Sequence, residues 1–312
     1  MAEFKHVPVM LNECLDGLNV KDGGIYFDGT LGGGGHSYEI LKRSSPNGKL
    51  IATDLDDYAL SRAKDRLLEF DGRFELIKSN FKNFPSIKEE LCPDGFDGIL
   101  LDLGVSSFQL DDRQRGFSYM ATDVALDMRM DKSNPLTAQR VVNEYSEKEI
   151  KRILAEYGEE RFAFQIASNI VKKRKEKPIE TTGELIEIIM QSIPKKFQKD
   201  GHPAKRTFQA IRIEVNGELD GLYETVVSMA RALKKGGRIA ILTFHSLEDR
   251  IVKKAFKELE CDCICDKSLP VCVCGKRKEI EILTKHPILA TEEELALNGR
   301  SKSAKLRIAE KI

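Results

Sequence analysis

The sequence contains no apolar run near the roughly 18 residues that a membrane-spanning helix requires. Residues 1–11 lack the apolar segment of a secretory signal peptide. Internal repeats and low-complexity tracts are absent too, and 50 basic residues balance 50 acidic ones. The 312 residues are 41% apolar and 32% charged, which excludes wholesale disorder and a collagen-like chain. We therefore expect a cytoplasmic globular protein of about two domains. Zero net charge leaves nucleic-acid binding open, because a total hides local patches.

Cysteines are scarce outside one short segment. Cys14 and Cys92 are isolated, whereas the other five fall within 14 residues: Cys261, Cys263, Cys265, Cys272 and Cys274. In a reducing cytosol such a cluster indicates a metal site or a reduced loop rather than disulfides. Alternate residues of an extended segment share one face, so a turn between the two groups would let four thiolates enclose a structural zinc. The C-x-C spacing differs from the usual C-x₂-C of zinc sites, and both interpretations stay open.

Short apolar runs alternate with helical patterns in the first third of the chain. The runs predict strands over residues 24–28, 49–54, 74–77 and 98–102. The last run is apolar throughout, as expected of a central parallel strand. This βαβα order predicts an α/β fold with a Rossmann-like, doubly wound sheet and helices on both of its faces.

A long stretch without strand patterns follows. Helical spacing recurs over residues 137–145, 146–157, 159–174 and 182–193. We therefore expect an all-helical insertion over residues 106–204, between core segments 1–105 and 205–312.

The α/β pattern then resumes. Helices are predicted over residues 217–235 and 247–259, the first closed by Gly236-Gly237. Strands are predicted over residues 238–244, 279–284 and 304–309, the last two as a hairpin pair with a long connection.

A glycine run, Gly32 to Gly35, follows the first predicted strand. Such a turn lets the backbone approach a ligand closely, although a merely flexible turn has the same composition. The dinucleotide pattern G-x-G-x-x-G fails, because its last position falls on Ser37 or Tyr38. An acid followed by G-x-G-x-G fits better. Asp28 is the acid, Thr30 replaces the first glycine, and the other two glycines match, as in many S-adenosylmethionine-dependent methyltransferases.

Two further acids end predicted strands. Asp54 follows the glycine turn by about 20 residues, where a carboxylate can accept hydrogen bonds from both ribose hydroxyls of a nucleoside. Asp102 ends the fourth strand among apolar neighbours, at the edge where ligands of open α/β sheets bind. An ordinary loop acid and a helix cap are the respective alternatives.

Longer motifs extend this pattern over most of the chain. They are DGTLGGGGHS (28–37), ILLDLGVSS (99–107) leading to QLD (109–111), LDMRM (126–130), YGEERF (157–162), RTFQAIR (206–212), FHSLEDR (244–250) and RSKSAKLR (300–307). Together they resemble the MraW family of ribosomal RNA methyltransferases. The resemblance implies an enzyme that transfers a methyl group from S-adenosyl-L-methionine to the exocyclic N4 of one cytidine in 16S rRNA, at the decoding centre.

The resemblance also implies a set of cofactor-binding residues: Gly34, Gly35, His36, Asp54, Phe81, Asp102 and Gln109. Phe81 follows the third predicted strand, where its ring can lie against adenine, although a core position is the alternative. The implied partner is 16S rRNA within the small ribosomal subunit. Neither a membrane nor an obligate protein partner is implied, and the resemblance carries no metal to the cysteines.

Methylation of a cytosine amine requires alignment more than activation. The amine is a weak nucleophile, so the protein must align nitrogen, methyl carbon and sulfur, and must offer an acceptor to the amine hydrogens. Amine methyltransferases usually place an acid or Asn before Pro-Pro-aromatic at this strand end. This chain has Asp102-Leu103-Gly104-Val105 instead. The acceptor is therefore open between Asp102, a backbone carbonyl and Asn216.

The predicted helical insertion carries a local excess of positive charge. Residues 161–212 contain 12 basic and 5 acidic residues, a local net charge of +7. Such a patch can follow RNA phosphates, whereas a solvated helix face is the ordinary alternative. The candidate RNA-binding residues are Lys172, Lys173, Arg174, Arg206 and Arg212.

Two rival functions remain at this point. An NAD-dependent oxidoreductase conflicts with the glycine spacing. A nucleic-acid-binding or assembly protein with a nonfunctional cofactor fold conflicts with the intact glycine loop and with Asp54 and Asp102.

Overall fold

The protein is described from a computed structural model that covers residues 8–199, 201–266, 271 and 273–312, with Ser107 described by its backbone alone. The described chain divides into two compact units. The first runs to Gly104 and resumes at Leu219, and the second spans Val105–Glu218. Within the described residues, no helix has the length and apolar character needed to cross a membrane.

The first unit is built on a seven-stranded sheet in the order β3-β2-β1-β4-β5-β7-β6. Its strands are β1 (Ile25–Asp28), β2 (Lys49–Asp54), β3 (Phe74–Lys78), β4 (Phe96–Asp102), β5 (Leu233–Thr243), β6 (Ile280–Ile282) and β7 (Lys305–Lys311). The first five strands are parallel, and β7 is antiparallel to both β5 and β6. The predicted Rossmann-like sheet and its final antiparallel pair are confirmed.

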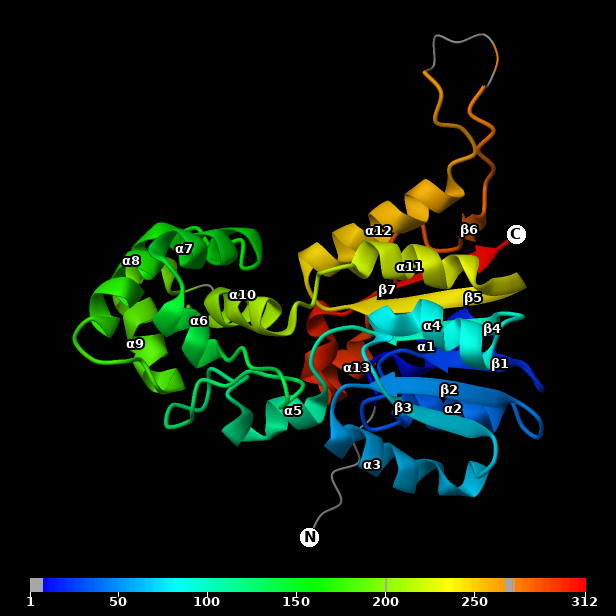
Figure 1. Ribbon diagram of the computed structural model, residues 1–312, viewed down its shortest axis with the longest axis horizontal. Coiled ribbons are helices and arrows are strands. Elements are labelled where there is room, and N and C mark those ends of the chain that lie inside the picture. Colours follow the sequence, from blue (N-terminus) through cyan, green and yellow to red (C-terminus); the bar gives the residue numbers. More distant parts are fainter. Residues whose placement is uncertain (1–7, 200, 267–270, 272) are drawn as a thin grey trace. The chain divides into compact units, whose positions relative to one another are not determined.

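Helices cover both faces of this sheet (Figure 1). They are α1 (Leu11–Leu18), α2 (Gly35–Arg43), α3 (Asp57–Leu67), α4 (Phe84–Leu91), α11 (Leu222–Arg231), α12 (Ser246–Glu260) and α13 (Glu292–Leu297), with short turns η1 (Leu68–Phe70), η2 (Phe81–Asn83) and η5 (Gly299–Ser303). Successive side chains of β4 point to opposite faces of the sheet, so they belong to two different core layers. Ile99 and Leu101 join the core beneath α4, α11 and α12, whereas Leu100 joins the core beneath α1, α2 and α3.

The second unit is helical. It contains α5 (Ser107–Asp111), η3 (Arg113–Arg115), α6 (Ala138–Glu144), α7 (Glu147–Glu156), α8 (Ala163–Arg174), α9 (Thr182–Ser192), η4 (Lys195–Phe197) and α10 (Lys205–Asn216). Its β structure, within the described residues, is one isolated bridge between Ala125 and Thr181. The unit has its own core, to which α6 to α10 all contribute. The predicted all-helical character is therefore confirmed.

Two expected boundaries need correction. The helical unit ends at Glu218 rather than at residue 204, because Phe208, Ile211 and Val215 of α10 pack into the helical core. The helix predicted over 217–235 is shorter, since α11 ends at Arg231. Gly236 lies inside β5 at a φ of 75°, where the pairing of β5 with β4 shifts register. Glycine at positive φ suits such a bulge, so it does not mark a helix end here.

Candidate active site

Acidic residues end three neighbouring strands at one edge of the sheet. β2 ends at Asp54, β1 at Asp28 and β4 at Asp102. β1 pairs with both β2 and β4 (Figure 1). From β1 the chain builds β2 and β3 on one side of it, and then β4 and β5 on the other side, so the strand order reverses between β1 and β4. Ligands of open α/β sheets bind at such a switch point, beyond the carboxyl ends of the strands. The structure thus brings the three predicted acids to the edge where a cofactor is expected.

Asp28 is almost fully buried and holds the start of the glycine loop. Its Oδ1 accepts the Thr30 N–H at 3.0 Å, and its Oδ2 accepts the Ser37 hydroxyl at 2.7 Å. Burial outweighs these hydrogen bonds and raises the pKa of Asp28 to about 6. Both oxygens are used within the fold, so Asp28 is a positioning residue for the loop.

The loop is tied to the strands on both sides of β1. The Thr30 hydroxyl accepts the Asp102 N–H at 2.6 Å, which joins the loop to the end of β4. The Thr53 hydroxyl donates to the Gly29 carbonyl at 3.0 Å, and the Gly32 N–H donates to Asp54 Oδ2 at 2.8 Å, which joins it to β2. The loop is therefore held in one shape by side chains of the same strands that carry the candidate acids.

Gly34 and Gly35 begin α2 where space is lacking. Gly34 has a φ of 71°, and a Cβ there would lie 3.0 Å from the Ala63 Cβ on α3. A Cβ at Gly35 would lie 2.3 Å from Pro8 Cγ. Both positions need glycine, one for its backbone conformation and both for close packing. At these two positions the glycines are therefore required by the fold, and the alternative of a merely flexible turn does not hold.

His36 is buried on α2 and lies between two groups of the first unit. Its Nε2 lies 3.2 Å from the Val9 carbonyl oxygen, and its Nδ1 lies 3.9 Å from Asp102 Oδ2. A carbonyl oxygen only accepts, so this contact places the proton on Nε2. The ring then presents Nδ1 to the Asp102 carboxyl group.

Asp54 has spare capacity to bind a ligand. Its Oδ1 accepts the Asp56 N–H at 2.9 Å, while Oδ2 is the acceptor for Gly32. Burial raises the pKa of Asp54, and these backbone hydrogen bonds oppose the rise. The two oxygens of a carboxylate offer about four lone-pair sites, so beside these backbone N–H groups Asp54 could still accept hydrogen bonds from ribose hydroxyls.

Phe81 opens the η2 turn that follows β3. It is half-buried and packs against the core cluster beneath α4. A Cβ added to Gly29 would lie 3.0 Å from the Phe81 Cβ, so this side chain adjoins the start of the glycine loop. This position is compatible with both sequence interpretations, the adenine contact and the core position.

Asp102 is in an unusual electrostatic position. Its Oδ1 is buried and has no hydrogen-bond partner among the described residues, although the side chain as a whole is 27% exposed. Burial, followed by the negative charges of Asp28 and Glu248, raises the pKa of Asp102 to about 8. Below about pH 8 this carboxyl group therefore stays mainly protonated, and a positive ligand beside it would favour its ionised form.

We expect this carboxyl group to make folding stability pH-dependent. Asp102 has a pKa near 8 in the folded chain and 3.8 ordinarily, so between these values the folded state binds a proton that the unfolded state lacks. The free energy of unfolding then falls as pH rises, by at most about 1.4 kcal/mol per pH unit. Asp102→Asn should flatten urea-unfolding stability between pH 6.5 and 8. Asp57→Asn, at an exposed acid, is the control, and parallel curves for wild type and Asp102→Asn would contradict this assignment.

The comparisons with known proteins agree with this geometry. The MraW methylase family matches residues 3–312. The chain belongs to this family. "Ribosomal RNA small subunit methyltransferase H" of Clostridium botulinum (strain Kyoto / Type A2) is 57% identical over 99% of this chain and 100% of that protein. The protein of the same name from Clostridioides difficile (strain 630) is 54% identical, again over 99% and 100%.

A solved structure resembles the chain more distantly. A SAM-dependent O-methyltransferase from Thermotoga maritima aligns over 99% of this chain and 68% of its own, with 11% identity and a TM-score of 0.40. This similarity is too low to indicate function.

MraW methylases use S-adenosyl-L-methionine, and the site fits that molecule. The cofactor carries a positive sulfonium, which suits the buried Asp102 Oδ1 without a partner in the described chain. Its ribose diol suits the spare acceptor sites of Asp54. The glycine loop leaves no room for side chains at Gly34 and Gly35, as expected where backbone approaches a ligand or a neighbouring helix closely.

Two predicted residues of the MraW site lie in the helical unit. Gln109, in α5, is buried and completes a capping box with Ser106: its Oε1 accepts the Ser106 N–H at 3.0 Å. Asn216, at the end of α10, accepts the Met130 N–H at 2.8 Å and donates to the Met128 carbonyl at 2.8 Å. Its amide thus holds the 128–130 segment, which is a structural use for one of the three candidate acceptors.

The predicted RNA-binding residues differ in their surroundings. Lys172 and Lys173 are exposed at the end of α8, and Lys173 pairs with Glu176 at 2.9 Å. Arg174 donates to the Val142 carbonyl at 2.8 Å, and the half-buried Arg212 makes two hydrogen bonds of 2.8 Å to Glu218. Arg206 is exposed and donates to the Glu159 carbonyl at 3.1 Å. Lys172, Lys173 and Arg206 are therefore accessible to solvent, while Arg174 and Arg212 brace the helical unit.

Sequence reasoning missed roles for Thr30 and Glu248. In the sequence Thr30 is only a departure from a glycine pattern, yet its hydroxyl joins the loop to Asp102. Glu248 is buried and completes a capping box with His245 at the start of α12, after β5. The four-residue pattern His-Ser-Leu-Glu, which resembles a capping box, was the available signal.

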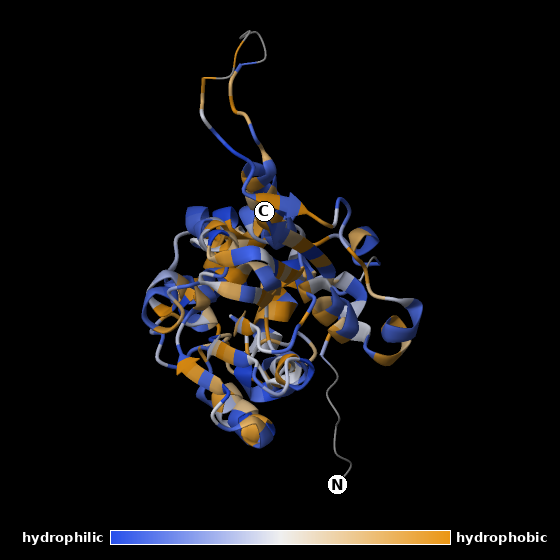
Figure 2. Cartoon of the chain, turned by 90° about the vertical axis from the view of Figure 1, so that its right-hand side faces the viewer, coloured by the Kyte–Doolittle hydropathy of each residue, from blue (hydrophilic) through white to orange (hydrophobic). Residues whose placement is uncertain are grey.

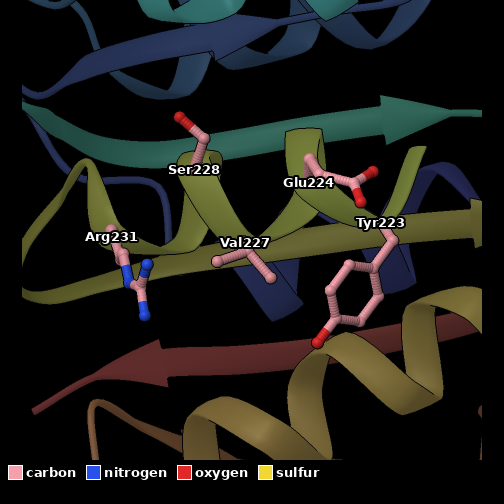
Figure 3. Close-up of a pocket in the computed structure, with 5 residues that line it drawn as sticks. All are labelled: Tyr223, Glu224, Val227, Ser228 and Arg231. Carbon is pink, nitrogen blue, oxygen red and sulfur yellow. The ribbon is translucent and has the colours of Figure 1, made fainter. Parts of the chain in front are cut away.

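A surface depression lies away from the strand-end acids. It lies along α11 and is lined by Tyr223, Glu224, Val227, Ser228 and Arg231 (Figure 3). Tyr223 hydrogen-bonds Glu258 of α12 there. The depression belongs to the helical layer over one face of the sheet and contains none of the residues at the strand ends.

Proposed function

We propose that this MraW methylase transfers the methyl group of S-adenosyl-L-methionine to the exocyclic N4 of one cytidine in 16S rRNA, at the decoding centre, in the cytoplasm. The observation that carries the proposal is the set of three strand-end acids around a rigid glycine loop. Relatives at 54–57% identity, named as ribosomal RNA small subunit methyltransferases, support the choice of RNA.

Asp54, Phe81 and the Gly34–His36 turn would hold the nucleoside part of the cofactor. When bound, S-adenosyl-L-methionine supplies an electrophilic methyl group. The chain's own task is to hold the cytosine amine in line with that group, because fixed alignment removes most of the entropic barrier.

Asp102 is the proposed acceptor for the amine hydrogens. Its Oδ1 is buried, lacks a partner among the described residues, and ends the strand at the switch point. An ionised carboxylate there would stabilise the positive charge that develops on the attacking nitrogen. Asn216 is the weaker candidate, because its amide already binds the backbone at Met128 and Met130.

The rival oxidoreductase function has less support. The glycine loop lacks the dinucleotide spacing, and the chain belongs to a methylase family. A binding protein with a nonfunctional site would not need the crowded, positive-φ glycine at residue 34 or an acid at the end of each of β1, β2 and β4.

A methyl-transfer assay tests the proposal. Small ribosomal subunits from a strain that lacks this protein are incubated with the enzyme and radiolabelled S-adenosyl-L-methionine, beside free 16S rRNA. We expect label on one decoding-centre cytidine, with N4-methylcytidine identified after nuclease digestion by mass spectrometry. Label on another atom or another RNA, or no label on either substrate, would overturn it.

The RNA surface makes a separate prediction. Lys172→Ala combined with Lys173→Ala should raise the KM for RNA several-fold and reduce the slope of log affinity against log salt by up to about 2, because each phosphate contact contributes about one unit. Cofactor affinity should stay unchanged. Lys64→Ala, at an exposed lysine of α3, is the charge-matched control. If the double variant behaves like wild type, this stretch of α8 is only a solvated face.

A further inference from the structure

The cysteine segment between α12 and β6 gathers its sulfurs at one point. The Sγ atoms of Cys263, Cys265 and Cys274 all lie within 4.8 Å of one another. These residues come from two arms of a segment that extends beyond the end of α12 (Figures 1 and 2). Cys272 lies outside the described residues. Three thiols drawn from both arms meet as the alternating spacing predicts.

The spacing of the sulfurs suits a metal better than a disulfide. Cys274 Sγ lies 3.9 Å from Cys263 Sγ. A disulfide requires about 2.05 Å. Two sulfurs bound to one zinc at about 2.3 Å and a tetrahedral angle are about 3.8 Å apart. The observed separation therefore matches a shared zinc ion.

Backbone N–H groups point at all three sulfurs. Cys265 N–H donates to Cys263 Sγ at 3.4 Å, Ile264 N–H to Cys274 Sγ at 3.4 Å and Val273 N–H to Cys265 Sγ at 3.3 Å. Such outer contacts orient the ligands of metal sites. The backbone of both arms is thus arranged around sulfur acceptors.

Burial contributes little to the described part of this segment. Ile264, Val271 and Val273 are 69%, 70% and 77% exposed, so these apolar side chains build no core. Figure 2 shows orange, hydrophobic stretches on both arms of this segment, between blue ones. A bound metal would supply the cross-link that burial does not, as in small zinc-stabilised loops.

We propose that Cys263, Cys265 and Cys274 bind one structural Zn²⁺ that fixes this segment. Cys261 is not part of this group: its thiol donates to the Cys263 carbonyl oxygen at 2.8 Å, so the fourth position is left to water or to another ligand. Each coordinating thiol loses its proton on binding, so the proton is released to solvent and no redox step occurs. Thiolates select zinc over magnesium or calcium. The site is independent of methyl transfer.

Metal analysis of the intact protein tests this proposal. The full chain is produced without a metal-affinity tag and purified under reducing conditions, and its zinc is measured by mass spectrometry. We expect about one zinc per chain, lost in Cys263→Ser combined with Cys274→Ser. Val273→Ser, at an exposed position of the same segment, should retain its zinc. Thermal unfolding of each variant checks that the sheet is intact.

Cobalt substitution gives a readout that does not depend on any variant. Replacing zinc by Co²⁺ in the wild-type chain should produce thiolate-to-cobalt charge transfer and the intense visible bands of a tetrahedral site. Well under one zinc per chain together with no such bands would overturn the proposal. A disulfide joining these cysteines in protein alkylated directly from cells would overturn it too.

Discussion

Asp54→Ala should weaken S-adenosyl-L-methionine binding by about 1–3 kcal/mol, or about 5- to 150-fold in Kd, because charge-assisted hydrogen bonds to two ribose hydroxyls are lost. The carboxylate is the acceptor at the end of β2 whose oxygens have lone-pair sites beyond those that Gly32 and Asp56 occupy. Isothermal titration calorimetry measures the effect directly, without RNA.

Asp54 also holds the loop, so its two roles must be separated. Asp54→Asn keeps one oxygen acceptor and the side-chain shape but removes the charge, so an intermediate loss of affinity is expected. Asp57→Ala removes an exposed acid three residues later, at the first turn of α3, and should leave affinity unchanged. Wild-type affinity in Asp54→Ala would remove Asp54 from the site.

The strands of the sheet could be predicted because each has a simple pattern of apolar residues. Runs such as Ile99 to Leu101 are apolar on both faces, which only a central parallel strand needs, and an acid follows each of the strands that end at the site. Position at a switch point then follows from topology, so Asp54 and Asp102 could be named from the sequence alone.

Other features depend on contacts that no pattern encodes. The place of α10 in the helical unit depends on where Phe208 and Ile211 are buried, since its amphipathic pattern would serve either unit. A glycine such as Gly236 occurs both at helix ends and in strand bulges. Only the register of β5 against β4 shows that it belongs to a bulge here. The amide of Asn216 could not be assigned to the backbone at Met128 and Met130, 86 and 88 residues away in the chain.

The acids at the site divide their work according to burial and partners. Both oxygens of Asp28 accept hydrogen bonds, from the Thr30 N–H and the Ser37 hydroxyl, so Asp28 shapes the loop. Asp102 has a buried oxygen without a partner in the described chain, so it is the group with capacity left for a cation or an amine. A carboxyl group of raised pKa would gain its charge most readily beside a positive ligand, which links cofactor binding to the state of the acceptor.

Gly34→Ala should impair both stability and cofactor binding. An alanine at a φ of 71° is strained by about 1–2 kcal/mol, and its Cβ would lie only 3.0 Å from the Ala63 Cβ and 3.2 Å from the Ala63 Cα. Overpacking of this kind adds about 1–3 kcal/mol or shifts the turn. We expect a lower free energy of unfolding in urea and a cofactor affinity at least about tenfold weaker by calorimetry.

Two variants separate strain from crowding. Gly72→Ala places alanine at a φ of 77° with nothing within 4 Å of its Cβ, so it should lose about 1–2 kcal/mol of stability and keep full cofactor affinity. Ala63→Gly added to Gly34→Ala removes the atom nearest the new methyl group, so it should restore part of the affinity relative to Ala63→Gly alone. Because Ala63 Cα stays 3.2 Å away, the restoration should be incomplete. Equal cofactor affinity in Gly34→Ala and Gly72→Ala would show that the turn at Gly34 does not shape the cofactor site.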